Sequence, residues 1–191
     1  MADRRTSLPL SLTDQFIVLI GLMGAGKSNL GRRLAATIGL PFKDSDNEVE
    51  KAAGCTIEEI FKRYGEAEFR DGEKRVIARL FGGATSVIAT GGGSFMSVET
   101  RRLIKERGIS IWLRAPLDLL DQRTQNRTHR PLLKKGNQRE ILAQLINERY
   151  PVYKHADITF DVNNEPASQS AERLMDTLIK YGEQLTPANL K

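Results

Sequence analysis

Residues 21–28, Gly-Leu-Met-Gly-Ala-Gly-Lys-Ser, constrain this chain more than any other stretch, because they fit the pattern G-x-x-x-x-G-K-S of a phosphate-binding loop. The apolar run 16–20 before them predicts a buried strand, and the spacing of apolar residues over 29–38 predicts a helix. A strand, a glycine-rich turn and a helix in that order are the context that such a loop needs. The alternative is a glycine-rich turn followed by Lys and Ser by chance.

The residue types in this loop suit a nucleoside triphosphate. Gly21, Gly24 and Gly26 let the backbone turn tightly with its N–H groups pointing inward, and the following helix presents the positive end of its dipole to phosphate. Lys27 adds a cation for the outer phosphates. Ser28 offers a hydroxyl ligand to Mg²⁺, the ion with which a triphosphate is presented for transfer.

The composition is that of one domain of 191 residues, with a formal charge of +5 and with basic and acidic residues interspersed. This balance suits small anionic substrates, and we expect no nucleic-acid partner. The single cysteine, Cys55, excludes an internal disulfide and favours a reducing compartment, so we expect a cytoplasmic protein. Residues 1–14 contain no long apolar run, which predicts a frayed tail instead of a signal peptide or a membrane span.

Strands and helices alternate along the rest of the chain, which predicts a parallel sheet with helices on both faces and ligands at the carboxyl ends of the strands. We expect one domain over 15–183, a mobile polar loop over 124–138 and a C-terminal tail over 184–191. The expected strands cover 16–20, 41–44, 86–90, 109–113 and 158–160, and the expected helices cover 29–38, 47–53, 57–64, 66–81, 98–107, 116–127, 139–150 and 167–181.

Asp44 and Asp46 stand two residues apart at the carboxyl end of the second expected strand, so both side chains point to the same side. One carboxylate near the magnesium and one near an acceptor hydroxyl would supply metal positioning and a base for phosphoryl transfer. The alternative is helix capping, since Ser45, Asp46 and Glu48 all favour a helix N-terminus. Capping accounts for Asp46 and leaves Asp44 unexplained.

Thr90 and the glycines at 91–93 follow the third expected strand. Three glycines allow a ligand to approach the backbone closely; a flexible turn is the alternative. This strand carries no aspartate of the Walker B kind, so Asp44 is the available partner for Ser28 at the magnesium.

Arg70 and Arg149 lie on helices near the same predicted edge of the sheet. A planar guanidinium is the best protein partner for a carboxylate. Taken singly, Arg149 is explained as a cation in the last turn of its helix, and Arg70 as an exposed ion pair with Glu66 or Glu73. Together with the phosphate loop and the aspartates, the two arginines favour a binding site.

Two further arginines belong to the polar loop and the helix before it. Arg130 precedes Pro131, and on a loop that closes over the triphosphate it would stabilise transition-state charge and help to exclude water. Arg123 offers a flat face for stacking on a base. A solvated basic loop is the alternative for both. His129 and His155 have no metal-ligating neighbours in the sequence and receive no role.

The ordered set of motifs resembles that of the shikimate kinase family over nearly the whole span from Phe16 to Leu178. The segments that carry the resemblance are 21–28, 42–46, 60–61, 68–70, 90–93, 130–133 and 148–153. The resemblance implies a three-layer P-loop kinase fold with a five-stranded parallel sheet, like that of nucleoside monophosphate kinases. It also implies transfer of the ATP γ-phosphate to the 3-hydroxyl of shikimate, with Mg²⁺, in the chorismate pathway to aromatic amino acids.

The resemblance also implies roles for the matching residues. Catalysis would rest on Lys27, Asp46 and Arg130, with Asp46 as the base. Nucleotide contacts would come from Gly24, Ala25, Gly26, Lys27, Ser28, Asn29, Arg123, Arg130 and Pro166. Shikimate contacts would come from Asp46, Phe61, Phe69, Arg70, Glu73, Gly91, Gly92, Gly93 and Arg149, with the two arginines on the carboxylate. Ser28, and Asp44 through water, would position Mg²⁺.

Two departures from the family pattern concern the nucleotide side. Asn29 stands where the family commonly has threonine, and residues 161–166 match the adenine-clamping region loosely. The rival functions are a related kinase of another hydroxy acid, such as gluconate, and a nucleotide-binding module without catalysis. The arginine pair favours shikimate, and the presence of Lys27 and Asp46 argues against the module. We expect a monomer whose partners are shikimate and ATP, with no membrane contact.

Overall fold

Five parallel strands form the centre of the computed structural model, which describes residues 8–125 and 137–185. The strands are β1 (Phe16–Ile20), β2 (Phe42–Asp44), β3 (Val87–Ala89), β4 (Gly108–Arg114) and β5 (Ile158–Asp161). Their order across the sheet is β2-β3-β1-β4-β5, and each neighbouring pair is parallel. The predicted five-stranded parallel sheet is therefore confirmed.

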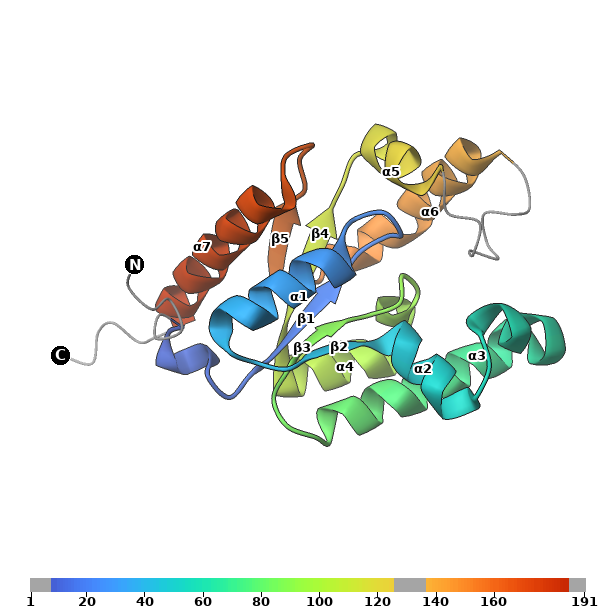
Figure 1. Ribbon diagram of the computed structural model, residues 1–191, viewed down its shortest axis with the longest axis horizontal. Coiled ribbons are helices and arrows are strands. Elements are labelled where there is room, and N and C mark those ends of the chain that lie inside the picture. The colour runs from blue at the N-terminus through green and yellow to red at the C-terminus, as the bar shows by residue number, and fades with distance from the viewer. Residues whose placement is uncertain (1–7, 126–136, 186–191) are drawn as a thin grey trace.

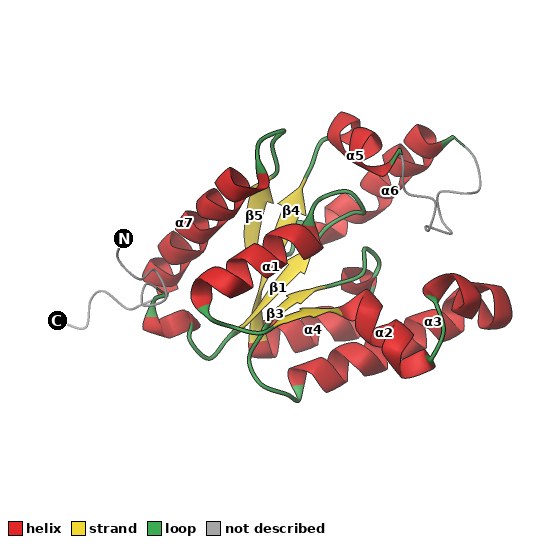
Figure 2. Cartoon of the chain, viewed as in Figure 1, coloured by secondary structure: helices red, strands yellow, loops and turns green. Residues whose placement is uncertain are grey.

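Helices cover both faces of this sheet, so that the protein has three layers (Figures 1 and 2). Helices α1 and α7 lie on one face, and α4 and α6 lie on the other. The helices are α1 (Lys27–Ile38), α2 (Ser45–Ala53), α3 (Ile57–Phe81), α4 (Val98–Arg107), α5 (Leu117–Thr124), α6 (Gln138–Tyr153) and α7 (Ala167–Leu185), with short 3-10 helices at Leu10–Leu12 and Ser94–Met96. In the described residues, no helix is long and apolar enough to cross a membrane.

Apolar side chains form two separate clusters. The larger one surrounds the sheet, and the central strand β1 is buried at all five positions, as expected for a strand covered on both faces. The smaller one joins α2 and α3 through Val49, Ile60, Phe69 and Val76. Helix α2 and the part of α3 up to Val76 therefore share a small core beside the main body, whereas Ile77 and Phe81 at the end of α3 belong to the larger cluster (Figure 1).

One helix boundary predicted at a glycine is confirmed, and one predicted at a proline is wrong. The predicted break between helices 57–64 and 66–81 is confirmed, because Gly65 in α3 has φ 84° and ψ 177°. The predicted end of a helix at residue 150 is wrong, since α6 includes Pro151 and runs on to Tyr153. Proline leaves the carbonyl of Asn147 without its helical donor. That residue is exposed to water, while the last turn buries Tyr153 completely.

The described part of the N-terminal segment is packed and does not form the frayed tail predicted for residues 1–14. Leu12 is fully buried in the main core, and the hydroxyl of Ser11 donates to the carbonyl oxygen of Gly182 in α7 at 2.8 Å. The burial of Leu12 and the hydrogen bond of Ser11 hold this turn against α7, which composition alone does not reveal.

Candidate active site

The phosphate loop lies between β1 and α1, at the edge of the sheet where the strands end (Figure 1). Gly24 and Gly26 have φ values of 83° and 96°, which a residue with a side chain rarely adopts. The amine of Lys27 donates to the carbonyl oxygens of Gly21 and Leu22 at 2.7 and 3.0 Å. The loop thus closes on itself around the lysine, in the strand-turn-helix context predicted from the sequence.

Asp44 uses its two carboxylate oxygens in two ways. Oδ2 accepts a hydrogen bond from the hydroxyl of Ser28 at 2.6 Å, and Oδ1 accepts one from the backbone N–H of Asp46 at 3.1 Å. Asp44 is therefore the N-cap of α2, and the interpretation that capping left this residue unexplained is wrong. The hydroxyl and carboxylate oxygens of Ser28 and Asp44 are the hard donors that Mg²⁺ prefers, so the pair fits this ion.

The glycine loop, residues 91–93 after β3, lies close to four of the residues predicted to contact the acceptor. A Cβ on Gly91 would overlap the carboxylates of Glu73 and Asp46, and one on Gly93 would overlap the guanidinium of Arg70. A Cβ on Gly92 would lie 3.3 Å from Nη1 of Arg149. The absence of side chains at 91–93 thus lets these charged groups lie close to the backbone, which favours a binding loop over a merely flexible turn.

Arg70 is already neutralised by acidic neighbours. Its guanidinium pairs with Glu73 at 2.9 Å and with Glu66 at 3.0 Å, so the ion pairs considered from the sequence are present. Burial acts to lower the pKa of Arg70, but the two carboxylates outweigh it and raise that pKa. Glu73 is only 2% exposed, and its other oxygen accepts from the hydroxyl of Ser94 at 2.6 Å. Glu73 therefore fixes Arg70 against the glycine loop.

Arg149 differs from Arg70 in having no anionic partner. It is 8% exposed and donates to the carbonyl oxygen of Gly92 at 2.8 Å. It forms no ion pair with any residue in the described parts of the chain. Burying an unpaired charge is costly, so a buried guanidinium beside the glycine loop marks a place for an anionic ligand.

One cavity of about 530 Å³ joins the phosphate loop to the aspartates and the glycine loop. Its lining includes Gly24, Ala25, Gly26, Lys27, Ser28, Asn29, Asp44, Asp46, Gly92 and Arg123. Arg123 donates to the carbonyl oxygen of Asn163 at 3.3 Å, and burial lowers its pKa. Pro166 is exposed, and its neighbours Glu165 and Ala167 line the cavity.

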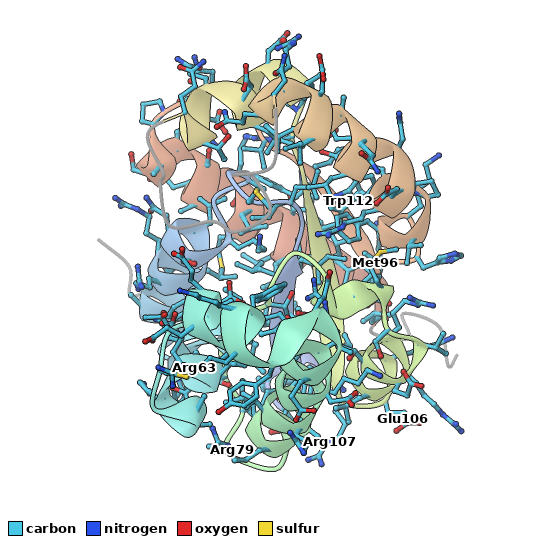
Figure 3. All side chains as sticks on the ribbon, turned by 90° about the vertical axis from the view of Figure 1, so that its right-hand side faces the viewer. Arg63, Arg79, Met96, Glu106, Arg107 and Trp112 are labelled. Carbon is cyan, nitrogen blue, oxygen red and sulfur yellow. The ribbon has the colours of Figure 1, made fainter. Side chains whose placement is uncertain are left out.

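Two aromatic rings of α3 lie next to Arg70. Phe61 and Phe69 pack against each other with centroids 4.7 Å apart, and the guanidinium of Arg70 lies over the ring of Phe69 at 5.0 Å. The break at Gly65 between them lets both rings face the same side. Figure 3 views this edge of the sheet, with Arg63 and Arg79 on the α2–α3 side and Trp112 close to α6.

Some of the expected site lies outside the described residues. Arg130 and most of the predicted loop over 124–138 belong to this part. The described ends of that loop are helical, because Thr124 ends α5 and Gln138 begins α6. The amide of Gln138 donates to Oδ1 of Asp121 at 2.8 Å, which ties the start of α6 to α5.

Two serines and a tyrosine hold the glycine loop, and none of them was predicted to do so from the sequence. The N–H of Gly91 donates to the hydroxyl of Ser45 at 2.9 Å, and the backbone N–H of Ser94 donates to the carbonyl oxygen of Gly91 at 3.2 Å. The hydroxyl of Tyr153 donates to the carbonyl oxygen of Gly92. Only the positions of Ser45 and Tyr153 in the sequence could have indicated this role. Ser45 lies between the two aspartates, and Tyr153 is one helical turn after Arg149.

Comparisons with known proteins agree with this geometry. The family model described as shikimate kinase matches residues 23–179. A shikimate kinase of Paramagnetospirillum magneticum is 52% identical over 95% of this chain and 94% of its own length. A shikimate kinase from Acinetobacter baumannii, solved in complex with shikimate, is 38% identical, with a TM-score of 0.85 over 88% of this chain and 94% of the other. A gluconokinase from Sinorhizobium meliloti, 18% identical with a TM-score of 0.59 over 91% of this chain and 97% of the other, shares the fold. The chain therefore belongs to the shikimate kinase family.

Proposed function

We propose that this protein transfers the γ-phosphate of ATP to the 3-hydroxyl of shikimate, in the pathway that leads through chorismate to the aromatic amino acids. The observation that carries the proposal is Arg149. A buried guanidinium without an anionic partner among the described residues, placed against the glycine loop, calls for an acceptor that carries a carboxylate. Family membership supports shikimate as that acceptor.

The residues divide between the two substrates. On the donor side, the backbone N–H groups of the phosphate loop hold the phosphates, and Lys27 stabilises the charge of the transferring group. On the acceptor side, Arg149 and Arg70 hold the carboxylate. Asp46 lies between the donor side and the acceptor side, since it lines the shared cavity and lies close to Gly91 of the glycine loop. It orients the acceptor hydroxyl and accepts its proton.

The pair of Ser28 and Asp44 would hold Mg²⁺ in this proposal. When bound, the ion neutralises negative charge on the phosphate oxygens. The remaining contribution of the chain is alignment of donor and acceptor, which supplies a large share of the rate in phosphoryl transfer. The active form in this proposal is a monomer.

A coupled assay of ADP release tests the proposal. The enzyme receives Mg²⁺ and ATP with shikimate, gluconate, a nucleoside monophosphate or no acceptor. We expect release above background with shikimate alone. Release with gluconate alone would assign a different acceptor, and ATP binding without release for any acceptor would indicate a nucleotide-binding module.

Two aspartate variants sharpen this test. Asp46→Asn keeps the size of the side chain and removes the proton acceptor, so we expect turnover to be abolished in a folded protein. Asp176→Asn makes the same chemical change at an exposed site on α7 and should keep normal turnover. Near-normal turnover by Asp46→Asn would remove Asp46 from the assigned role.

A further inference from the structure

Tyr153, the last residue of α6, has a buried hydroxyl to which the roles above assign nothing. The side chain is fully buried, and its Oη donates to the carbonyl oxygen of Gly92. Arg149, one helical turn earlier, donates to the same oxygen at 2.8 Å. The middle residue of the glycine loop is therefore tied to α6 by two donors that meet at one atom.

Aromatic neighbours fix the ring that carries this hydroxyl. The ring centroid of Tyr153 lies 5.9 Å from that of Trp112, 6.1 Å from that of Tyr150 and 6.3 Å from that of Phe95. Burial raises the pKa of Tyr153 to about 12, so the hydroxyl stays protonated and remains a donor at neutral pH. A donor held in this way does not follow movements of the substrate.

Gly92 occupies the point where the two halves of the site meet. A Cβ on Gly92 would lie 3.3 Å from Nη1 of Arg149 and 3.5 Å from the carbonyl oxygen of Gly21 in the phosphate loop. The peptide between Gly92 and Gly93 is planar and trans. Holding its carbonyl toward α6 therefore also holds the N–H of Gly93 in the opposite direction.

Arg149 by itself is a poor anchor for this carbonyl. In the proposed function its guanidinium binds the carboxylate of the acceptor, so its donors are shared between the ligand and Gly92. Tyr153 has one donor and no exposed surface, so its hydrogen bond is independent of the ligand. The carbonyl keeps a partner in both the empty and the occupied site.

We propose that Tyr153 is a positioning residue for phosphoryl transfer: its hydroxyl holds the carbonyl of Gly92 and thereby sets the glycine loop in register with the phosphate loop. This inference rests on the proposed function. Alignment of the reacting groups acts on the transition state, and a misplacement of about 1 Å costs about 10²-fold in rate. Loss of the hydroxyl therefore lowers kcat and leaves the affinity for shikimate nearly unchanged.

Tyr153→Phe tests this role with Tyr150→Phe as its matched control. Both variants lose one hydroxyl from α6, a fully buried one at Tyr153 and a partly buried one at Tyr150, and both keep the ring. Tyr150 packs edge-on against Trp112 with centroids 4.8 Å apart, and its hydroxyl donates to the carbonyl oxygen of Ala115 at 2.5 Å, away from the glycine loop. A general effect of removing a hydroxyl from this helix appears in both variants, and an effect of the Gly92 anchor appears only in Tyr153→Phe.

The measurements are kcat and KM with shikimate and ATP, urea unfolding, and the Kd for shikimate from the fluorescence of Trp112, the single tryptophan of the chain. We expect kcat to fall by about tenfold or more in Tyr153→Phe, with Kd within about threefold of wild type, and nearly unchanged kinetics in Tyr150→Phe. Wild-type kcat in Tyr153→Phe, or an equal loss in both variants, would overturn the role of Tyr153. A wild-type enzyme that releases no ADP with shikimate would instead refute the proposed function.

Discussion

Arg149 is 8% exposed and has no ion-pair partner in the described part of the chain. Its buried charge therefore lowers the stability of the protein without ligand and strengthens the binding of an anionic ligand. Arg149→Met should therefore raise the KM for shikimate by about 10- to 100-fold, because a hydrogen bond to a charged group contributes about 1.5–3 kcal/mol. The same change should leave the free energy of unfolding unchanged or raise it by about 1 kcal/mol. Tyr153 continues to satisfy the carbonyl of Gly92 in this variant.

Steady-state kinetics and urea unfolding measure these two effects separately. Arg139→Met, on the same helix, is the control: Arg139 is half exposed and pairs with Asp118 at 2.6 Å, so its loss should change both quantities little. Destabilisation of Arg149→Met by more than about 2 kcal/mol would mean that Arg149 stabilises the empty fold, as a structural ion pair would.

Tyr153 also predicts a pH dependence of stability. Burial raises its pKa from 10.0 to about 12, so between these values the unfolded chain releases the proton more readily than the folded protein. The stabilisation by the protonated hydroxyl is complete below pH 10 and is lost as the pH rises to 12. The difference in unfolding free energy between wild type and Tyr153→Phe should shrink by about 3 kcal/mol over this range.

Urea unfolding at several pH values from 8 to 12 measures this difference, and Tyr64→Phe is the control because Tyr64 is 63% exposed. If the difference between wild type and Tyr153→Phe were independent of pH, the hydroxyl would not be held in its protonated form by the fold.

At the scale of elements, the sequence pattern correctly predicted those features that depend only on residues close together in the chain. The phosphate loop and the break at Gly65 depend on a few adjacent residues, so the sequence sufficed for both. The continuation of α6 past Pro151 depends on the burial of Tyr153 against other parts of the chain, which no local pattern contains. The candidate site shows the same limit. The residue types of Asp44 and Arg149 predicted charged groups at the site, but the contact of Arg149 with Gly92 joins residues 57 positions apart, which no local pattern predicts.

Two glycines of α3 give a paired prediction about this helix. Gly65 has φ 84° and ψ 177°, a conformation nearly restricted to glycine, so Gly65→Ala should lower the free energy of unfolding by about 1–3 kcal/mol. Gly72 has ordinary helical backbone, so Gly72→Ala should raise it by about 0.5–1 kcal/mol. A Cβ at either position meets no atom within 4 Å, so backbone conformation alone separates the two variants.

Urea unfolding of both variants tests this, and kinetics add a second readout. Because Gly65 lies between Phe61 and Phe69, straightening α3 there moves the two rings apart, and Gly65→Ala should also raise the KM for shikimate. Equal stability changes in the two variants would show that the break in α3 is not a constraint on the fold.

At the scale of the whole molecule, the division into two apolar clusters predicts where the protein opens. Helices α2 and α3 share a core of four buried residues, whereas the sheet belongs to the large core. Regions with little buried apolar surface open at a lower free energy than the global unfolding free energy. Without ligand, the amides of residues 45–71 should therefore exchange hydrogen faster than those of β1 and β4.

Shikimate should reduce this difference, because the contacts proposed for it bridge the two parts: Arg70 and Glu73 belong to α3, whereas Arg149 belongs to α6. At 100 times its Kd, a ligand that binds only the closed form stabilises it by about 2.7 kcal/mol, which slows exchange about 100-fold. Hydrogen exchange read by mass spectrometry, with and without shikimate, measures this for each segment. Arg149→Met at the same ligand concentration is the control and should show slowing of only about 2- to 11-fold. If shikimate slowed exchange in α6 and the glycine loop but left residues 45–71 unchanged, α2 and α3 would not take part in holding the acceptor, and the contact of Arg70 with the glycine loop would be a feature of packing alone.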